Sequence, residues 1–409
     1  MKSKCLWLIN HDATVPEFET RLRTNEFADY FGRYSEVYVL ASSVIHNSEL
    51  RLLKRWEFIK ILDQGSYKTI LLKTPSYGSN KFLRIVGYVY LPLAIIIFRN
   101  RLRRPDVISI TANVPFDFLF IVFKKLFQSK IVVEILDLWP ESFVTMGLLN
   151  RDSRLLKVMI RLEKYFYKHA DKLVFSMPGA KDYLIDINYK QPEYQKISII
   201  NNGVNLDKFY SDSRSVVLKD ADLENDAIDK VIYMGSMRHA NDLDFLIDTA
   251  CYLRDKTNVK FLLYGDGDQR PRLEERCLKE DISNVIWKQK YIPMENVPYV
   301  LSRASVNIMN YRQGEWGKYG GSQSKLFQYL AAGNPIACNI EVVHSPIIQL
   351  KLGISYMAVN PKNYSQEIFG LVNMSEEERL RLKKRAQSKV REFDYVYLAE
   401  RMKNEVFDF

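Results

Sequence analysis

Residues 320–336 read Gly-Gly-Ser-Gln-Ser-Lys-Leu-Phe-Gln-Tyr-Leu-Ala-Ala-Gly-Asn-Pro-Ile. A loop with two glycines, Gly320 and Gly321, leads into a short apolar helix that ends at Gly333. Glycine lets the main chain approach a ligand closely, and the first N–H groups of a helix are unpaired, so this junction can bind an anion. Lys325 would add a full positive charge. The alternative is an ordinary loop-to-helix junction with a serine cap.

Strand-like runs surround this stretch in the second half of the chain. They cover residues 197–200, 230–234, 260–263, 285–287, 304–309 and 335–338. Two of them lead into glycine turns, Gly235-Ser236 and Gly265-Asp266-Gly267-Asp268. Strands that alternate with helix-length segments form parallel sheets, which bind ligands outside the carboxyl ends of their strands. We therefore predict that both turns and the 320–321 loop meet at one sheet edge.

The first half of the chain has the same alternation. Its strand-like runs cover residues 6–9, 36–40, 107–111 and 130–136. We predict the α/β class, with two doubly wound domains. Residues 211–229 are polar and have no apolar period, so we expect a surface loop there. Residues 375–409 begin with Ser-Glu-Glu-Glu, a capping signal, and are expected to be helical.

Composition supports a globular chain with one basic half. The 409 residues are 47% hydrophobic, which is enough for two cores. Four cysteines without a Cys-x-x-Cys pair suggest neither a zinc site nor a disulfide framework, and fit a reducing cytosol. Residues 1–200 hold 30 Lys and Arg against 20 Asp and Glu, and residues 201–409 hold 29 against 29, so the first half carries the net charge of +10. This asymmetry favours an anionic partner, nucleic acid or membrane; the alternative is a solvated basic face.

The longest apolar segment covers residues 82–98 and is barely long enough to span a bilayer. We expect a core or interfacial helix, with burial against a sheet favoured over contact with acidic lipid headgroups. The four arginines that follow it are Arg99, Arg101, Arg103 and Arg104. The first ten residues read as a strand and not as a signal peptide, so secretion is not expected.

Several motifs occur together in an order known from one family. Residues 200–209, Ile-Asn-Asn-Gly-Val-Asn-Leu-Asp-Lys-Phe, resemble the domain-junction signature of GT-B sugar transferases of glycosyltransferase family 4. Residues 231–235, 262–267 and 324–335 resemble later motifs of that family, in its order. Residues 137–142, Asp-Leu-Trp-Pro-Glu-Ser, are similar to a motif of the branch that builds bacterial capsule and O-antigen repeats.

The resemblance implies the GT-B fold, in which two Rossmann-like doubly wound domains face each other across a cleft. It implies an acceptor-binding domain over residues 1–188, a nucleotide-sugar-binding domain over residues 189–385, and a C-terminal helix over residues 386–409 that returns to the first domain. It also implies a retaining transferase that moves a sugar from a nucleotide diphosphate sugar to an acceptor alcohol.

The donor site that the resemblance implies is centred on the leaving diphosphate, where amide N–H groups and a cation would stabilise the developing charge. No metal is expected, because Asp266 and Asp268 lie in a glycine-rich turn that explains them as turn residues. The nucleobase is expected near residues 290–292. The predicted donor-binding residues are Gly235, Ser236, Arg238, Gly265, Gly267, Tyr291, Gly320, Gly321, Ser322, Ser324, Lys325 and Gln328.

The acceptor side is expected in the first domain. Asp137 is the candidate catalytic residue, which would orient the acceptor hydroxyl or the reacting sugar; its alternative is an N-cap of the next helix. Trp139, Glu141 and Arg21 are the candidate acceptor-binding residues, with a core position as the alternative for Trp139. The acceptor implied is a glycan on a polyprenyl diphosphate. The enzyme would then sit peripherally on the anionic inner face of the plasma membrane, in the cytoplasm, and no nucleic-acid partner is expected.

The chain departs from the family pattern at Ser236 and Asn241, where relatives carry Arg and Lys, at Leu136, where many carry His or Arg, and at two carboxylate positions. Relatives carry carboxylates where this chain has Gly320 and Gln328, and Gln328 can hydrogen-bond a ribose only as a neutral group. Two alternatives to a transferase follow. One is a non-catalytic protein of the same fold that binds sugar nucleotides or acts as a scaffold, and the other is a nucleotide-sugar 2-epimerase.

Overall fold

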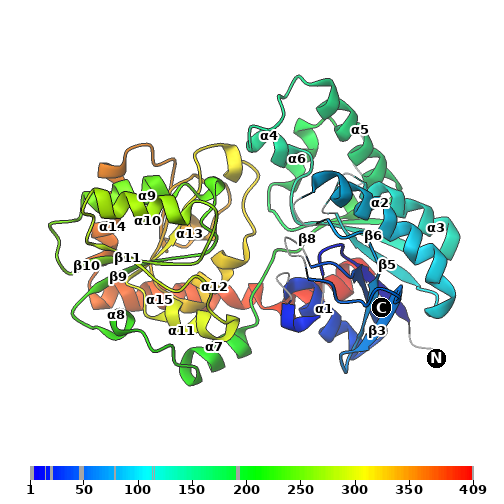
Figure 1. Ribbon diagram of the computed structural model, residues 1–409, viewed down its shortest axis with the longest axis horizontal. Helices are drawn as coiled ribbons and strands as arrows, with labels where there is room; N and C mark the ends of the chain where they lie inside the picture. The colour runs from blue at the N-terminus through cyan, green and yellow to red at the C-terminus, as the bar shows by residue number, and fades with distance from the viewer. Residues whose placement is uncertain are drawn as a thin grey trace. The chain divides into compact units, whose positions relative to one another are not determined.

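The chain folds into two compact units in a computed structural model (Figure 1). Unit 1 comprises Met1–Asn202 together with Tyr395–Phe409, and unit 2 is Gly203–Asp394. The residues that the structure describes are 4–13, 15–18, 22–45, 50–77, 80–112, 114, 116–189 and 194–407.

Both unit boundaries fall later in the chain than the sequence suggested. The strand β8 (Ile197–Ile199) still pairs with β7 (Lys172–Phe175) of unit 1, so the first boundary lies beyond residue 188. The helix α15 (Glu376–Val390) packs against α12 (Ser324–Ala332) of unit 2, so the second lies beyond residue 385. The chain then returns to unit 1 with α16 (Tyr395–Met402).

Unit 1 contains an eight-stranded sheet in the order β3-β4-β2-β1-β5-β6-β7-β8. All neighbouring strands are parallel except β3 and β4. The remaining strands are β1 (Cys5–Ile9), β2 (Glu36–Ser42), β3 (Ile59–Asp63), β4 (Lys68–Leu72), β5 (Val107–Thr111) and β6 (Lys130–Ile135). The four predicted runs correspond to β1, β2, β5 and β6. The edge strand β3 was missed because it is half-exposed and lacks an apolar run. The strands β4 and β7 were also missed, although they are buried, because their apolar runs are only three residues long.

Helices cover both faces of this sheet. On one face, α1 (Leu22–Gly32) packs against α16, and Phe27 and Phe31 are buried with Leu398 of α16 and with Phe407. The reversal of strand order at β1 sends the later crossovers to the other face. That face carries α2 (Lys81–Phe98), the 3-10 helix η3 (Asp117–Ile121), α3 (Val122–Phe127), α4 (Glu141–Thr145), α5 (Arg154–His169) and α6 (Ala180–Asp186).

Unit 2 contains a parallel six-stranded sheet in the order β11-β10-β9-β12-β13-β14. Its strands are β9 (Asp229–Met234), β10 (Val259–Tyr264), β11 (Val285–Trp287), β12 (Val306–Met309), β13 (Ile336–Cys338) and β14 (Gly353–Ser355). Its other helices are α7 (Leu206–Ser215), α8 (Ala221–Glu224), α9 (Leu243–Cys251), α10 (Arg270–Lys279), α11 (Val297–Ser302), α13 (Pro346–Gln349) and α14 (Pro361–Val372). The doubly wound α/β class predicted for both halves is confirmed.

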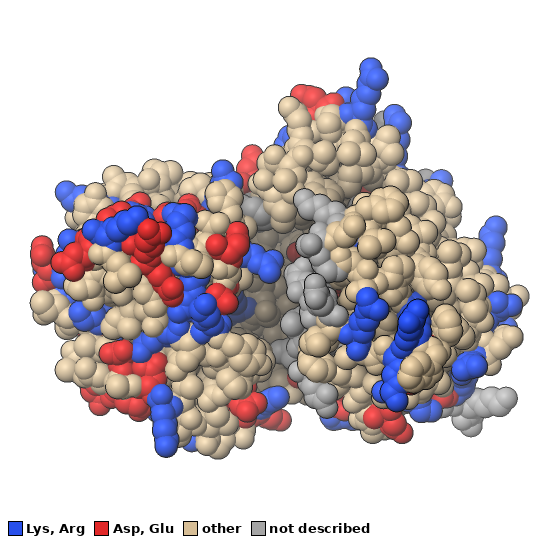
Figure 2. Space-filling view, viewed as in Figure 1, with Lys and Arg blue, Asp and Glu red and all other residues tan. Residues whose placement is uncertain are grey.

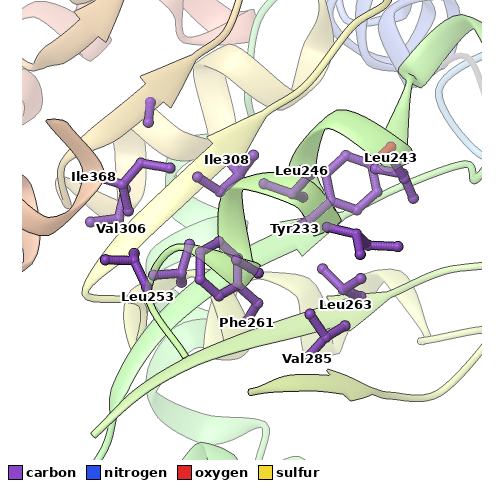
Figure 3. Close-up of a cluster of buried hydrophobic side chains, with 14 of the residues drawn as sticks. Tyr233, Leu243, Leu246, Leu253, Phe261, Leu263, Val285, Val306, Ile308 and Ile368 are labelled. Atoms are coloured by element: carbon purple, nitrogen blue, oxygen red, sulfur yellow. The ribbon is translucent and has the colours of Figure 1, made fainter. Parts of the chain in front are cut away.

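The core of unit 2 explains why β9 and β10 are continuous apolar runs. Parallel strands in the middle of a sheet are buried on both faces. On one face, Tyr233 of β9 and Phe261 of β10 pack against Leu246 of α9 and Ile368 of α14, all fully buried or nearly so (Figure 3). The sheet is therefore a rigid base for the loops that leave its carboxyl edge.

One expectation for unit 2 was wrong. Residues 211–229 were expected to form a surface loop, but α7 extends to Ser215 and α8 begins after Asp220. The Asp220 side chain accepts hydrogen bonds from the N–H groups of Asp222 and Leu223, which is the cap that lets such a short polar helix form.

The charge asymmetry is visible on the surface. In the view of Figure 2, Lys, Arg, Asp and Glu side chains intermingle on unit 2, whereas unit 1 shows a broad uncharged area with basic side chains around it and a few acidic ones at its upper and lower ends. The basic excess of the first half therefore belongs to unit 1.

Candidate active site

Loops that follow three adjacent strands of unit 2 are joined by main-chain hydrogen bonds. The N–H of Met237, after β9, donates to Asp266 O, after β10, over 2.8 Å. The N–H of Gly265 donates to Gln289 O, after β11, over 3.1 Å. The glycine turns after β9 and β10 therefore meet at one edge of the sheet, as their sequence pattern indicated.

Two glycines in these turns are required by close main-chain approach. Gly265 has a φ of +128°, and a Cβ atom there would lie 1.9 Å from Gly235 O. A Cβ atom on Gly267 would lie 2.3 Å from Met237 O. Real side chains do not fit at such distances, so the turns depend on glycine for their shape.

Lys325 lies at the same edge, although it is distant in sequence from the first turn. A Cβ atom built on Gly235 would lie 2.2 Å from the Lys325 ammonium nitrogen. This nitrogen lies 5.0 Å from the centroid of the Tyr233 ring. Among the described residues, no carboxylate pairs with it. Burial lowers the pKa of Lys325 from 10.5 to about 8. A partly desolvated cation without a counter-ion is suited to bind an anionic ligand.

The N-terminus of α12 adds main-chain donors beside Lys325. The helix begins at Ser324, and its cap residue, Gln323, makes no side-chain hydrogen bond to the first turn. Gly320 has a φ of +84°, which favours glycine in the preceding loop. Unpaired N–H groups at a helix start carry partial positive charge, so Ser324 and Lys325 form one positively polarised corner.

The other predicted donor residues lie in the loops that follow β9 and β11, in the loop before α12, and on α12 itself. The hydroxyl of Ser236 accepts a hydrogen bond from Asn241 Nδ2 over 2.9 Å, and Arg238 is exposed two residues later. Gln328 is half-buried and lies one helical turn after Ser324, on the same side of α12. Tyr291 is 78% exposed in the loop after β11. Gly321 and Ser322 are half-buried in the loop before α12.

Arg270 was not found from the sequence. It is buried at the start of α10, donates to Gly265 O, and donates to Lys288 O over 2.8 Å. Its Nε atom is 2.6 Å from Glu274 Oε1. It therefore ties the loop after β10 to the loop after β11. The sequence signal for it is an arginine directly after Gly-Asp-Gly-Asp-Gln, at the start of the next helix.

The Asp137 motif of unit 1 follows β6. Asp137 is exposed, and the peptide bond between Trp139 and Pro140 is cis. The N-cap of α4 is Pro140, so Asp137 does not cap that helix, and the structural alternative for it is wrong. Glu141 is buried and pairs with Arg151 at 2.6 Å, which favours a structural role for this carboxylate. Arg21 lies outside the described residues.

A small pocket lies behind this motif, within unit 1. Its volume is about 40 Å³, and its lining includes Asp137, Trp139 and Glu163. The carboxylate of Glu163 accepts hydrogen bonds from Tyr167 over 2.7 Å and from Tyr183 over 2.8 Å. Burial raises the pKa of Glu163 from 4.5 to about 8. The sequence does carry a signal for this residue, because Glu163 is the lone acid of α5 and lies one turn before a tyrosine.

The raised pKa of Glu163 makes stability depend on pH. Between about pH 4.5 and pH 8 the folded protein holds a proton on Glu163 that the unfolded chain has released. The free energy of unfolding should therefore fall as the pH rises through this window, relative to a Glu163→Gln variant. Urea titrations of both proteins across the window measure the difference. If the free energies of unfolding of the two proteins changed in parallel with pH, the raised pKa of Glu163 would be contradicted. The control is Glu295→Gln, at an exposed carboxylate of unit 2.

A comparison with protein families identifies the second unit. Residues 228–369 match the family described as "Glycosyl transferases group 1". The chain carries a glycosyltransferase domain. The matched residues include the glycine turns, Arg270, Lys325 and α12, so the whole positively polarised corner lies within this domain. No curated protein matches the sequence.

Solved structures extend the likeness to both units of the glycosyltransferase. One is described as trehalose-6-phosphate from E. coli bound with UDP-2-fluoro glucose, with a TM-score of 0.76, 11% identity and coverage of 99% of each chain. Another is HepE of Anabaena in complex with UDP and glucose, with a TM-score of 0.65, 12% identity, and coverage of 99% of this chain and 100% of that one. The N-terminal domain of Candida albicans trehalose-6-phosphate phosphatase has a TM-score of 0.72, 11% identity, and coverage of 100% and 97%. These likenesses confirm the predicted GT-B fold.

Proposed function

We propose that this glycosyltransferase moves a sugar from a nucleoside diphosphate sugar to a glycan acceptor carried on a polyprenyl diphosphate, with retention at the anomeric carbon. It would belong to the branch of glycosyltransferase family 4 that builds bacterial surface polysaccharides. The motif at residues 137–142 and the order of the motifs in unit 2 support this proposal.

The observation that carries the proposal is the Lys325 ammonium, which lies over Gly235 beside the start of α12. Negative charge builds on the leaving diphosphate as the glycosidic bond breaks. A cation and aligned N–H groups already in place stabilise that charge without reorganisation. HepE and the E. coli protein were solved with UDP or a UDP sugar, which supports a donor of this chemical class here.

The reaction proposed needs no metal ion, because Lys325 and the helix N-terminus supply the positive charge. Among the described residues, no three His, Cys, Asp or Glu side chains form a group that could hold a metal ion. Asp137 would orient the acceptor hydroxyl, and the departing diphosphate would take its proton. The acceptor would be reached at the inner face of the plasma membrane, where the basic surface of unit 1 meets anionic lipid.

The test is release of nucleoside diphosphate from candidate donor sugars, with and without EDTA, in the presence of extracted lipid-linked acceptor. We expect release that depends on the acceptor and continues in EDTA. Abolition by EDTA would contradict the metal-free proposal. Donor binding without any release would instead favour a non-catalytic protein of the same fold, an alternative that Gly320 and Gln328 keep open.

A further inference from the structure

The outer side of α2 is apolar where a surface helix is normally polar. Phe82 is 71% exposed, Leu93 is 52% exposed and Ile97 is 64% exposed. With the half-buried Val86 and Val89 they follow steps of four, three, four and four residues. This spacing forms a single stripe along the helix. The stripe lacks a covering element in the part of the chain that the structure describes.

The inner side of α2 belongs to the core of unit 1. The segment Phe82–Arg101 is long and apolar enough to cross a membrane, but it is only 33% buried. Leu91 and Ile95 are fully buried, so the helix cannot leave the unit without exposing them. The expectation of burial against a sheet is therefore right for one side of the helix, and the other side needs a different environment.

The apolar stripe continues on neighbouring helices of the same layer. The short helix η3 contacts α2, α3 and α5, so these elements form one layer over one face of the sheet (Figure 1). Val122 and Leu126 of α3 are exposed, and so are Leu155 and Val158 of α5. Exposed apolar patches of this extent mark an interaction surface.

The same layer presents basic side chains and almost no acidic ones. In α2, η3, α3, α5 and the 3-10 helix η2 (Arg99–Arg101), the carboxylates are Asp117 and Glu163. Asp117 is buried against His11 at 2.9 Å, and Glu163 is held by two tyrosines, so neither faces outward. The exposed cations of the layer include Arg99, Arg101, Lys125, Arg154, Lys157 and Arg161. In Figure 2 this region is a broad uncharged area with blue side chains around it.

We propose that the outer surface of α2, α3 and α5 docks the protein onto an anionic lipid bilayer. Phe82, Leu93 and Ile97 would enter the boundary between headgroups and acyl chains, while the arginines and lysines contact the headgroup phosphates. Charge and apolar surface together favour this partner over nucleic acid, which would not accommodate the apolar stripe.

The docking surface and the Asp137 motif share the same helices. Asp137 and Trp139 line their pocket together with Phe118 of η3 and Met159 of α5, on the inner side of the layer. The link to catalysis rests on the proposed function: a bilayer held against the outer side of the layer would bring a lipid-anchored acceptor close to Asp137. Docking to the bilayer does not depend on the proposed function.

Flotation of the full chain with vesicles tests the proposal. We expect the protein to float with vesicles of equal parts phosphatidylglycerol and phosphatidylcholine, and not with phosphatidylcholine alone. Binding should weaken as salt rises from about 0.1 M to 1 M, which shortens the Debye length from about 10 Å to 3 Å. Equal binding to both vesicle types, or none to either, would overturn the proposal. Retention in alkaline carbonate would indicate a true span and would also overturn it.

Paired variants locate the surface. Leu93→Gln with Ile97→Gln should weaken vesicle binding by roughly tenfold or more for each side chain. Arg101→Gln with Lys125→Gln should weaken it about fivefold for each cation at low salt. Leu278→Gln, at a residue 83% exposed on α10, and Lys384→Gln on α15 are matched controls in unit 2 and should bind as wild type.

Near-UV circular dichroism checks that each variant is folded. Unchanged binding by both pairs of folded variants would overturn the assignment of the surface. Because the vesicles contain neither donor nor acceptor, this result is independent of whether sugar transfer is demonstrated.

Discussion

Replacing Lys325 by methionine is expected to slow sugar transfer by roughly 10²- to 10³-fold, the usual loss when one preorganised donor to a developing charge is removed. The ammonium lies at the corner formed by Gly235 and the start of α12, without a carboxylate partner among the described residues. The variant should also bind nucleoside diphosphate at least about tenfold more weakly, because a hydrogen bond to a charged group is lost. Titration calorimetry and a release assay measure the two effects.

The pH dependence of donor binding gives a separate test of Lys325. Its pKa is lowered to about 8, so in the ligand-free protein the ammonium loses its proton as the pH rises past that value. Wild-type affinity for nucleoside diphosphate should fall above pH 8, and the Lys325→Met variant should lack this fall.

Removal of the same charge should stabilise the ligand-free protein. Below about pH 8 the folded protein keeps a cation in a partly dry site, and methionine avoids that cost. A higher melting temperature with weaker donor binding would therefore be the signature of a functional cation. Lys384→Met, at an exposed lysine of α15, should change neither property, and an unaltered affinity in Lys325→Met would defeat the assignment.

Gly265→Ala is expected to destabilise the protein by about 3 kcal/mol or more. The φ of +128° is nearly restricted to glycine, and the new methyl group would lie 1.9 Å from Gly235 O. The clash is with main-chain atoms. Because β9 and β10 are paired along their length, neither turn can move away from the new methyl group without a large cost in free energy. Urea unfolding measures the loss, and donor binding should fail even where the variant remains folded.

Gly370 offers the matched control for this substitution. It lies within α14, and a Cβ atom there meets nothing within 4 Å. Gly370→Ala should stabilise the protein by up to about 1 kcal/mol, because alanine favours the helix. If Gly265→Ala and Gly370→Ala lowered the free energy of unfolding by similar amounts, the strained turn after β10 would not be the cause of the destabilisation.

The sequence predicted best where its signal was local and periodic. Apolar strands that alternate with helix-length segments indicated both sheets, and the meeting of the glycine turns at Gly235 and Gly265 in unit 2 followed from the rule for parallel sheets. The edge strand β3 was missed because half-exposed strands lack an apolar run, and α8 was missed because its cap, Asp220, lies in a polar stretch.

Long-range partners could not be predicted from the sequence. The contact between Arg270 and Lys288 O, and the tyrosines around Glu163, join residues whose proximity only the packed structure creates. The two sides of α2 illustrate the same limit. Its residues are apolar all round, so the periodicity could not distinguish the side that is buried against unit 1 from the side that is exposed.

The path of the chain through the two units has a consequence for biosynthesis. The core beside α1 includes Phe27 and Phe31 but also Leu398, Met402 and Phe407, which are translated after all of unit 2. A nascent chain that has emerged only to residue 202 therefore has an unfinished hydrophobic core, with aromatic side chains that await their covering helix. Unit 1 must either wait for the ribosome to finish or be protected by a chaperone, and a fragment that stops before residue 395 should aggregate.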